Sequence, residues 1–399
     1  MVVRGGLVLA AALLGLVPGT APAQRSEWSG EVALEARRFP QPPLNPLQHG
    51  DNLSAAVRPQ YYREWDGGRR SFRLELLGRV DQGDDERTHA DVRELSWTWV
   101  SRDWEVTAGI GRVFWGVTES LHLVDIVNQT DLVENPDGED KLGQPLLRLA
   151  LIRDWGTLEA FVLPGFRERS FPGPEGRLWP ALPLAPAVYE SPRRRSHVDG
   201  ALRWSHSTGI WDLGLSVFRG TSREPRLVIA TDPFGRPRAI VPVYDIIDQA
   251  GVDVQATLED WLWKLEWIRR RGQGPDFTAL AAGFEYTFYG VLETAADVGL
   301  VAEYLYDSRD DAFQAPFQDD VFVGLRLTLN DVQSTELLAG VIADRRSGER
   351  FYSVEASRRV GESWTVSLEG RWFSGGEPGS LLHALRNDDY LQLELAWHF

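Results

Sequence analysis

The chain has 399 residues, of which 43% are hydrophobic and 25% are charged, and its formal net charge is −16. Beyond the N-terminus it lacks the apolar runs of about 20 residues that a polytopic helical membrane protein needs, and the acid excess argues against nucleic-acid binding, which needs a basic face. The absence of cysteine excludes disulfides, thiolate metal sites and cysteine nucleophiles.

Residues 1–23 have the layout of a secretory signal. One charge, Arg4, precedes an apolar run over residues 5–17, and the small-residue site Ala21-Pro22-Ala23 follows. The apolar run is too short to span a membrane as a helix. We therefore expect residues 1–23 to be a signal peptide that is removed after export through the inner membrane, leaving residues 24–399 as one domain.

After Gln24 the dominant pattern is alternation of apolar and polar residues. It appears first in residues 28–36 and returns in residues 72–80, 104–110, 261–267 and 364–372. A period of two is typical of strands, and no segment longer than about ten residues has the period of a helix. The sequence therefore predicts an all-β protein.

The connections between the predicted strands alternate in length. Short links occur at residues 66–68, 101–103, 154–156, 207–209, 259–260, 289–290, 330–332 and 361–363. Longer polar stretches occupy residues 39–50, 82–88, 112–146, 168–196, 220–246, 270–277, 307–317, 344–350 and 374–388. Such alternation is typical of a transmembrane up-and-down antiparallel β-barrel with short periplasmic turns and long outer loops. It predicts eighteen strands, or sixteen if the weak segment 50–64 is not a strand.

Sixteen residues are tryptophan, and many of them lie beside the short links. The predicted membrane girdle consists of Trp65, Trp104, Trp155, Trp211, Trp261 and Trp364. Indole rings gather at the headgroup boundary of a bilayer, which explains this one-sided placement. The alternative is that strands in general favour aromatic residues.

The last strand, residues 389–399, alternates strictly and ends with Trp397, His398 and Phe399. In this terminus, in the signal and in the strand rhythm the chain resembles Gram-negative outer-membrane proteins. The resemblance implies location in the bacterial outer membrane, contact with its lipid and lipopolysaccharide, and recognition of Trp397 and Phe399 by the barrel-assembly machinery. A basic run in a long loop, Arg193-Arg194-Arg195, is a candidate for pairing with lipopolysaccharide phosphates.

The third long connection, residues 114–146, is too apolar for a loop in solvent. Thr118 is placed to cap a short helix, and Asp131 with Glu134 resembles a second cap. The connection follows the fifth predicted strand, where porins have a loop that folds inward, and it resembles a segment of uncharacterised proteobacterial porin-like proteins. We expect it to enter the lumen and constrict it; the alternative is an outer cap packed on neighbouring loops.

The residues predicted to line the lumen or its constriction are polar side chains on inward-facing positions and in this connection. They are Arg58, Arg73, Arg79, Glu119, His122, Asp125, Asp131, Glu134, Arg148, Glu285 and Glu303. Basic early strands and acidic later strands would create a transverse field across the pore. The alternative is the mixed charge of any water-facing wall.

Catalytic and metal motifs are weak. The sequence contains neither Gly-x-Ser-x-Gly nor His-Glu-x-x-His. Ser120, His122 and Asp125 are neighbours in sequence only, whereas a triad is defined by geometry. The acidic residues 137–140 and 307–311 have the composition of solvated loops. We predict no catalytic residue, metal or cofactor.

These features together predict a channel for passive diffusion of small hydrophilic solutes, constricted by residues 114–146. Two alternatives remain: a substrate-specific outer-membrane transporter or exporter, and a barrel enzyme acting on lipid or peptide. The outward apolar faces leave both a monomer and a homo-oligomer open.

Overall fold

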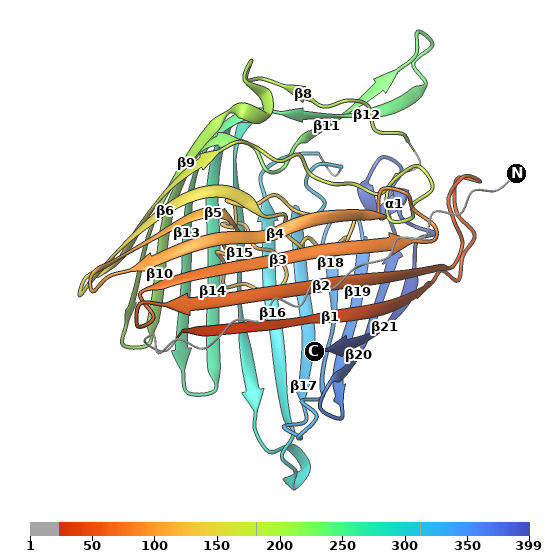
Figure 1. The fold of residues 1–399 in the computed structure, drawn as a ribbon. Coiled ribbons are helices and arrows are strands. Elements are labelled where there is room, and N and C mark those ends of the chain that lie inside the picture. The colour runs from red at the N-terminus through yellow and green to blue at the C-terminus, as the bar shows by residue number, and fades with distance from the viewer. Residues whose placement is uncertain (1–23, 181, 312) are drawn as a thin grey trace, which may run out of the picture.

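A computed structural model describes residues 24–180, 182–311 and 313–399, so the predicted signal peptide lies outside the described residues. Eighteen strands form one antiparallel sheet that closes on itself, because β1 pairs with both β2 and β21 (Figure 1). The barrel strands are β1 (Arg25–Arg38), β2 (Asn52–Trp65), β3 (Arg70–Asp81), β4 (His89–Val100), β5 (Trp104–Gly111), β6 (Gln144–Arg153), β7 (Gly156–Pro164), β9 (Val198–Thr208), β10 (Trp211–Thr221), β13 (Ile246–Leu258), β14 (Trp261–Gly272), β15 (Gly274–Phe288), β16 (Asp297–Asp307), β17 (Asp319–Thr328), β18 (Glu336–Asp344), β19 (Arg350–Val360), β20 (Trp364–Ser374) and β21 (Tyr390–His398).

Alternation along each strand separates an apolar outer surface from a polar interior. On β1, Val32 and Leu34 are 38% and 59% exposed, whereas Glu35 and Arg37 on the other face are buried. An apolar outside around a polar inside suits a wall that faces lipid, since closure leaves no unpaired backbone edge in the bilayer. In the described part of the chain, no helix is long and apolar enough to cross a membrane.

The closure of the barrel depends on a glycine. The N–H of Gly30 donates to the carbonyl of Phe399 over 3.1 Å, and the N–H of Phe399 donates back to the carbonyl of Gly30 over 3.0 Å. A Cβ at residue 30 would lie 2.7 Å from the carbonyl oxygen of Arg58. Beside this pair, Trp397 is in register with Trp364 on β20 and Val32 on β1. The predicted terminal strand therefore completes the wall.

The predicted strand count of eighteen is confirmed, and the weak segment 50–64 belongs to β2. One connection differs from its prediction. Residues 270–277 were expected to form a long loop, but β14 runs to Gly272 and β15 begins at Gly274, leaving Gln273 alone between them. Both glycines have positive φ, 93° and 81°, which lets the backbone reverse in so few residues.

A small second sheet, which the sequence analysis did not predict, stands at the long-loop end of the barrel (Figure 1). It consists of β8 (Val188–Tyr189), β11 (Arg226–Thr231) and β12 (Pro237–Tyr244). Short helical turns η1 (Arg194–Ser196), η2 (Val291–Glu293) and α1 (Leu381–Ala384) complete the described elements. The six tryptophans predicted for the girdle all lie at or next to strand ends on the short-link side, and Trp155, Trp211, Trp261 and Trp364 are exposed.

Candidate functional site

Residues 112–143, here called the luminal loop, connect β5 to β6 without forming any helix. The predicted helix caps at Thr118 and at Asp131 with Glu134 are therefore wrong. The reason lies in the wall, because carboxylates on distant strands accept the backbone N–H groups of residues 117–120 and 124. These external acceptors replace a helix as partners for the backbone of this segment.

The carboxylate of Glu266 on β14 is the first of these acceptors. It is 0% exposed and accepts N–H bonds from Val117 over 2.7 Å, Thr118 over 3.0 Å and Val124 over 3.1 Å. The hydroxyl of Thr118 also donates to it over 2.8 Å. A buried carboxylate is stable only when such donors replace its water, so Glu266 and the luminal loop stabilise each other.

Glu303 on β16 holds the next two residues. It accepts the N–H of Glu119 over 2.7 Å, and it accepts both the N–H and the hydroxyl of Ser120 over 2.9 and 2.5 Å. The side chain of Glu119 is held in turn by Arg326 on β17, at 2.7 Å. This side of the wall therefore fixes both the backbone and the side chains of the luminal loop.

The opposite side of the wall holds the later half of the luminal loop by ion pairs. Arg79 on β3 binds Glu134 at 2.8 Å, and Arg93 on β4 binds Asp131 at 2.5 Å. In the ring of eighteen strands, β3 and β4 lie far from β14 and β16. The luminal loop therefore crosses the interior of the barrel and is anchored at both sides.

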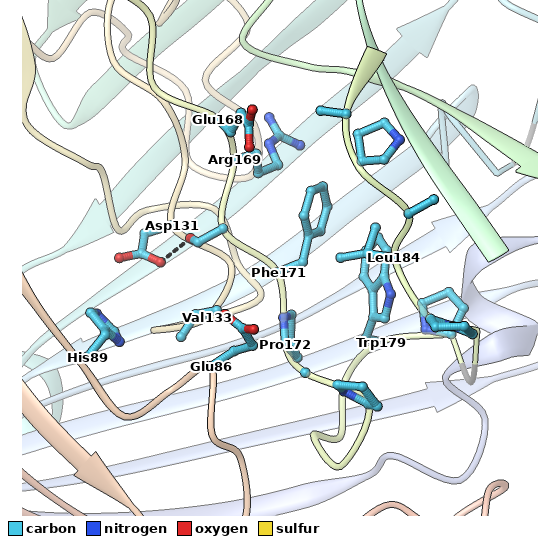
Figure 2. Close-up of a pocket in the computed structure, with 18 of the residues that line it drawn as sticks. Glu86, His89, Asp131, Val133, Glu168, Arg169, Phe171, Pro172, Trp179 and Leu184 are labelled. Carbon is cyan, nitrogen blue, oxygen red and sulfur yellow. Dashed lines mark hydrogen bonds between the residues drawn. The ribbon is translucent and has the colours of Figure 1, made fainter. Parts of the chain in front are cut away.

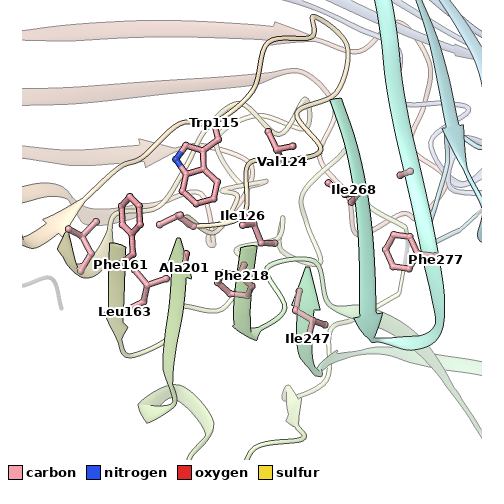
Figure 3. Packing of buried hydrophobic residues seen from close by; sticks show 13 residues of the cluster. Trp115, Val124, Ile126, Phe161, Leu163, Ala201, Phe218, Ile247, Ile268 and Phe277 are labelled. Atoms are coloured by element: carbon pink, nitrogen blue, oxygen red, sulfur yellow. The ribbon is translucent and has the colours of Figure 1, made fainter. Parts of the chain in front are cut away.

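Apolar packing adds to these anchors (Figure 3). Trp115, Val124, Ile126 and Val127 of the luminal loop pack against inward-facing side chains of the wall, among them Phe161. The rings of Trp115 and Phe161 meet edge to face at 5.6 Å. Burying each large apolar side chain stabilises this position by about 1.5–3 kcal/mol relative to its exposure to solvent.

His122 lies inside the luminal loop between two carboxylates. Its Nε2 is 2.9 Å from Glu139, and its Nδ1 is 3.9 Å from Glu266. Burial opposes protonation, but the two carboxylates outweigh it and raise the pKa of His122 to about 10. The two carboxylates therefore favour the protonated imidazole at neutral pH.

Ser120, His122 and Asp125 do not form a triad. The hydroxyl of Ser120 donates to Glu303, His122 faces Glu139, and Asp125 is paired with Lys141 at 3.3 Å. Among the described residues no group of three or more His, Asp or Glu side chains is arranged to hold a metal ion.

Two acidic groups of the luminal loop have altered acidity. The surrounding protein shields the carboxyl group of Asp137 from solvent and raises its pKa to about 7. The N–H of Glu139, which donates to this carboxylate, partly opposes the shift. The pKa of Asp140 rises to about 6 for the same reason, with the nearby negative charge of Glu134 adding to it. Both carboxyl groups therefore change charge between pH 5 and 8.

Two of the cavities that the luminal loop borders differ in the charge of their lining. The first, of about 430 Å³, is lined by eight carboxylates and three arginines, among them Glu119, Glu394 and Arg58, and is here called the acidic cavity. The second, of about 460 Å³, is lined by four arginines and three carboxylates, among them Arg148, Arg203 and Glu105, and is here called the basic cavity. The two cavities share no lining residue.

A third pocket, of about 660 Å³, lies nearer the long-loop end and is here called the mouth pocket (Figure 2). The proline-rich connection from β7 to β9 forms much of its wall, with the rings of Phe171 and Trp179 4.5 Å apart. Arg169 lines the same pocket, and its Nε donates to Gln129 over 3.3 Å. The mouth pocket therefore combines aromatic and proline surfaces with a guanidinium group.

The same connection is fixed across the mouth of the barrel by Arg177. This buried side chain donates to Asp388 over 2.7 Å and to the carbonyl of Asn387 over 2.5 Å, and its guanidinium lies 4.3 Å from the centre of the Phe39 ring. These partners belong to the connections that flank β1 and β21. Nothing in the local sequence around residue 177 indicates these contacts.

The predicted pore residues fall into two groups. Arg58, Arg73, Glu119 and Arg148 line the acidic or basic cavity. By contrast, Asp125, Asp131 and Glu303 have buried side chains that hold the luminal loop, while Arg79 and Glu134 bind each other and also border the acidic cavity. Glu285 is paired with Arg326 at 3.2 Å. The sequence did not single out Arg93 or Arg177 as site residues, although alternation places Arg93 on a strand.

The fold defines a closed, eighteen-strand antiparallel barrel of porin type. Among solved structures, OccK3 (OpdO) of Pseudomonas aeruginosa superposes with a TM-score of 0.56 at 13% identity, over 94% of this chain and 95% of that chain. A variant of Rhodopseudomonas blastica porin also matches, with a TM-score of 0.45 at 12% identity, over 94% of this chain and 100% of that chain. No protein-family model and no curated protein matches the sequence. The likeness to OccK3 shows a shared fold and nothing of the solute.

Proposed function

We propose that this protein is an outer-membrane channel for passive diffusion of small hydrophilic solutes, and that the luminal loop sets its constriction. The observation that carries the proposal is the crossing of the barrel interior by a loop that is anchored on both walls. A barrel of eighteen strands is wide enough for an aqueous channel unless loops fill it. The loop therefore decides how much of the interior is open to solutes.

The charge of the acidic cavity supports a preference for cations. Eight carboxylates face three arginines in its lining, and excess negative charge in a narrow, water-filled passage raises the local concentration of cations. The basic cavity has the opposite excess, which supports the proposed transverse field across the pore. Net selectivity then depends on the passage that the solute follows.

Deletion of residues 118–141 tests the constriction. In planar-bilayer recordings of the purified protein, we expect the variant to conduct several times more current than the wild type and to lose part of its cation preference. Unchanged conductance and selectivity would contradict the proposal. Heat-modifiable migration of the variant on gels shows whether the barrel itself has assembled.

The mouth pocket favours a second candidate, a substrate-specific transporter. Its aromatic and guanidinium lining offers a built surface for a solute, whereas a general pore needs none. A current that saturates with increasing solute, or a solute that blocks the pore at low concentration, distinguishes this candidate from a general channel. The solved structures that share the fold are porins and channels, which favours a channel over an enzyme by fold analogy only. Ser120, His122 and Asp125 have separate partners, so they give the enzyme alternative no support.

The location and assembly of the protein belong to the same proposal. We infer that residues 1–23 direct export, that the barrel lies in the bacterial outer membrane, and that Trp397 and Phe399 are read by the assembly machinery. The pairing of Phe399 with Gly30 gives the terminal residue a physical role at closure. If removal of Phe399 leaves outer-membrane assembly unchanged, the last part of the inference is wrong.

A further inference from the structure

A large hollow lies on the outer surface of the wall and not in the lumen. It has a volume of about 940 Å³ and extends over β7, β9, β10, β13 and β14. We call it the wall groove. Its lining includes the exposed side chains of Val162, Leu202 and Val217, which face away from the barrel interior.

The strand register explains why the wall is hollow at this place. Leu158, Trp204, Leu215, Val252 and Trp267 form one row of large side chains across the five strands. The next row towards the long loops contains Ala160 and Ala250, and the row after that contains Gly200. Loss of side-chain volume at these positions leaves a depression between larger neighbours.

Arginines lie on the β10 and β14 side of the wall groove, in the same two rows as Gly200 and Ala250. Arg219, Arg269 and Arg271 line it, and their side chains are 79%, 50% and 58% exposed. Two carboxylates oppose them, since Asp248 is 3.5 Å from Arg219, and Asp276 is 3.4 Å from Arg269 and 3.0 Å from Arg271. Each guanidinium has five N–H donors, so most of these donors remain available.

Charge on a lipid-facing wall is costly at the bilayer centre and tolerated near the headgroups. The three arginines therefore mark the depth at which the wall leaves the hydrocarbon layer. Guanidinium groups bind phosphate through paired N–H bonds, and the apolar depression, which lies beside them in the same two rows of the strand register, suits an acyl chain. The groove thus offers both halves of a phosphorylated lipid a matching surface.

We propose that the wall groove binds one phosphorylated lipid of the outer leaflet, with an acyl chain along Ala160, Gly200 and Ala250 and a phosphate on Arg219, Arg269 and Arg271. The proposal depends on the membrane location inferred above and not on conduction. Arg195, which the sequence analysis singled out for lipopolysaccharide, is held by Glu168 at 2.6 Å. The groove arginines are better placed, because an apolar surface lies directly beside them.

The test is native mass spectrometry of the full-length barrel in detergent, titrated with diphosphoryl lipid A and with lipid A that lacks both phosphates. The wild type should retain one diphosphoryl molecule and bind the dephosphorylated form more weakly. Near an anionic lipid each arginine contributes about a fivefold effect, so replacing all three (R219S, R269S and R271S) should weaken binding on the order of a hundredfold.

A second variant, Gly200→Phe, fills the groove and leaves the arginines intact. A Cβ at residue 200 meets only the carbonyl oxygen of Phe161, at 3.7 Å, so the strand can accept the substitution. We expect binding to fall about tenfold through loss of acyl contact. Matched controls are Arg350→Ser, an exposed arginine at the start of β19, and Gly78→Phe on β3, where a Cβ meets only Val57 at 3.5 Å.

Retention of diphosphoryl lipid A by the wild type and by both controls, with loss in the two groove variants, supports the proposal. Equal retention by every variant, or no retention by the wild type, overturns it. A wild-type dimer that Gly200→Phe converts to monomers would also overturn it, because a second copy would then cover the groove. None of these readouts measures current, so their failure leaves the proposed channel untouched.

Discussion

The luminal loop and the outer hairpin, formed by β11 and β12, are both long connections at the same end of the barrel, yet their backbones find partners in opposite ways. The outer hairpin pairs with itself, with Val228 opposite Val241 and Ile229 opposite Ile240. The luminal loop instead donates to Glu266 and Glu303 on the wall. A connection that pairs internally can leave the barrel, whereas one that depends on the wall must stay inside it.

This difference predicts that the luminal loop leaves its position in the lumen when its acceptors on the wall are removed. Glu266→Ala leaves three backbone N–H groups without their partner, and each unsatisfied buried group costs about 1–3 kcal/mol. We expect release of residues 117–124 and a several-fold higher single-channel conductance. Glu266→Gln keeps one acceptor oxygen and should have a smaller effect.

The control for this experiment is Glu336→Gln, an exposed carboxylate that borders the acidic cavity without bonding to the luminal loop. Its conductance should stay close to that of the wild type. If Glu266→Ala conducts like the wild type, the wall does not hold the loop in the way the hydrogen bonds indicate.

The ion pair of Arg79 with Glu134 anchors the luminal loop on the other side of the wall, and its loss should affect stability more than conductance. Arg79→Met removes the guanidinium that binds Glu134 and Glu35, and the two carboxylates remain buried without it. Removing one member of a buried ion pair costs about 3–5 kcal/mol. We expect a lower urea midpoint for unfolding in detergent, measured by the loss of heat-modifiable migration.

Arg73→Met is the matched control, because Arg73 is 57% exposed and its nearest carboxylate, Glu94, is 3.7 Å away. An exposed pair of this kind contributes about 0–1 kcal/mol. Equal midpoints for the two variants would show that burial of the Arg79 network adds no stability.

The acidic groups of the luminal loop should make selectivity depend on pH. The pKa values of Asp137 and Asp140, about 7 and about 6, lie above the ordinary value for aspartate. These groups are charged above and neutral below those values, so cation preference should fall as the pH decreases from 8 to 5. Reversal potentials in a salt gradient measure this change.

Asp137→Asn combined with Asp140→Asn should remove most of this dependence and reduce cation preference at pH 8. A variant that retains the wild-type pH profile would place the titrating groups elsewhere in the lumen. No residue of the outer hairpin lines the acidic cavity, so the hairpin should not contribute to this pH dependence.

The smallest effect is expected in the outer hairpin itself. Replacement of residues 230–239 by Asn-Gly joins the paired residues Ile229 and Ile240 through a two-residue turn. Because this change removes only exposed or half-buried residues at the tip, conductance and selectivity should equal those of the wild type. A changed conductance would show that the hairpin tip enters the path of the solute.

Much of the wall could be predicted from sequence, because alternation such as that of Trp261, Trp263, Leu265 and Trp267 depends only on which face meets lipid. The hairpin at residues 270–277 was misjudged because its polar and glycine residues have the composition of a loop, while their backbone still pairs. The outer hairpin was missed for a related reason, since its strands lie within a connection that was treated as one loop.

The anchors of the luminal loop could not be predicted in the same way. The fifth-to-sixth position and the apolar composition of residues 114–146 suggested an inward loop. However, Val117 meets Glu266 across 149 positions of sequence, and Arg177 meets Asp388 across 211. Such pairs depend on the curvature and size of the closed wall, which no local pattern contains.

The distance in sequence between the luminal loop and its acceptors also orders events during assembly. Residues 117–120 follow the fifth barrel strand, but Glu303 lies on the thirteenth. Until that strand joins the wall, the N–H groups of Glu119 and Ser120 lack their carboxylate partner and must be hydrated. The luminal loop can therefore reach its final position only after both sides of the wall have formed.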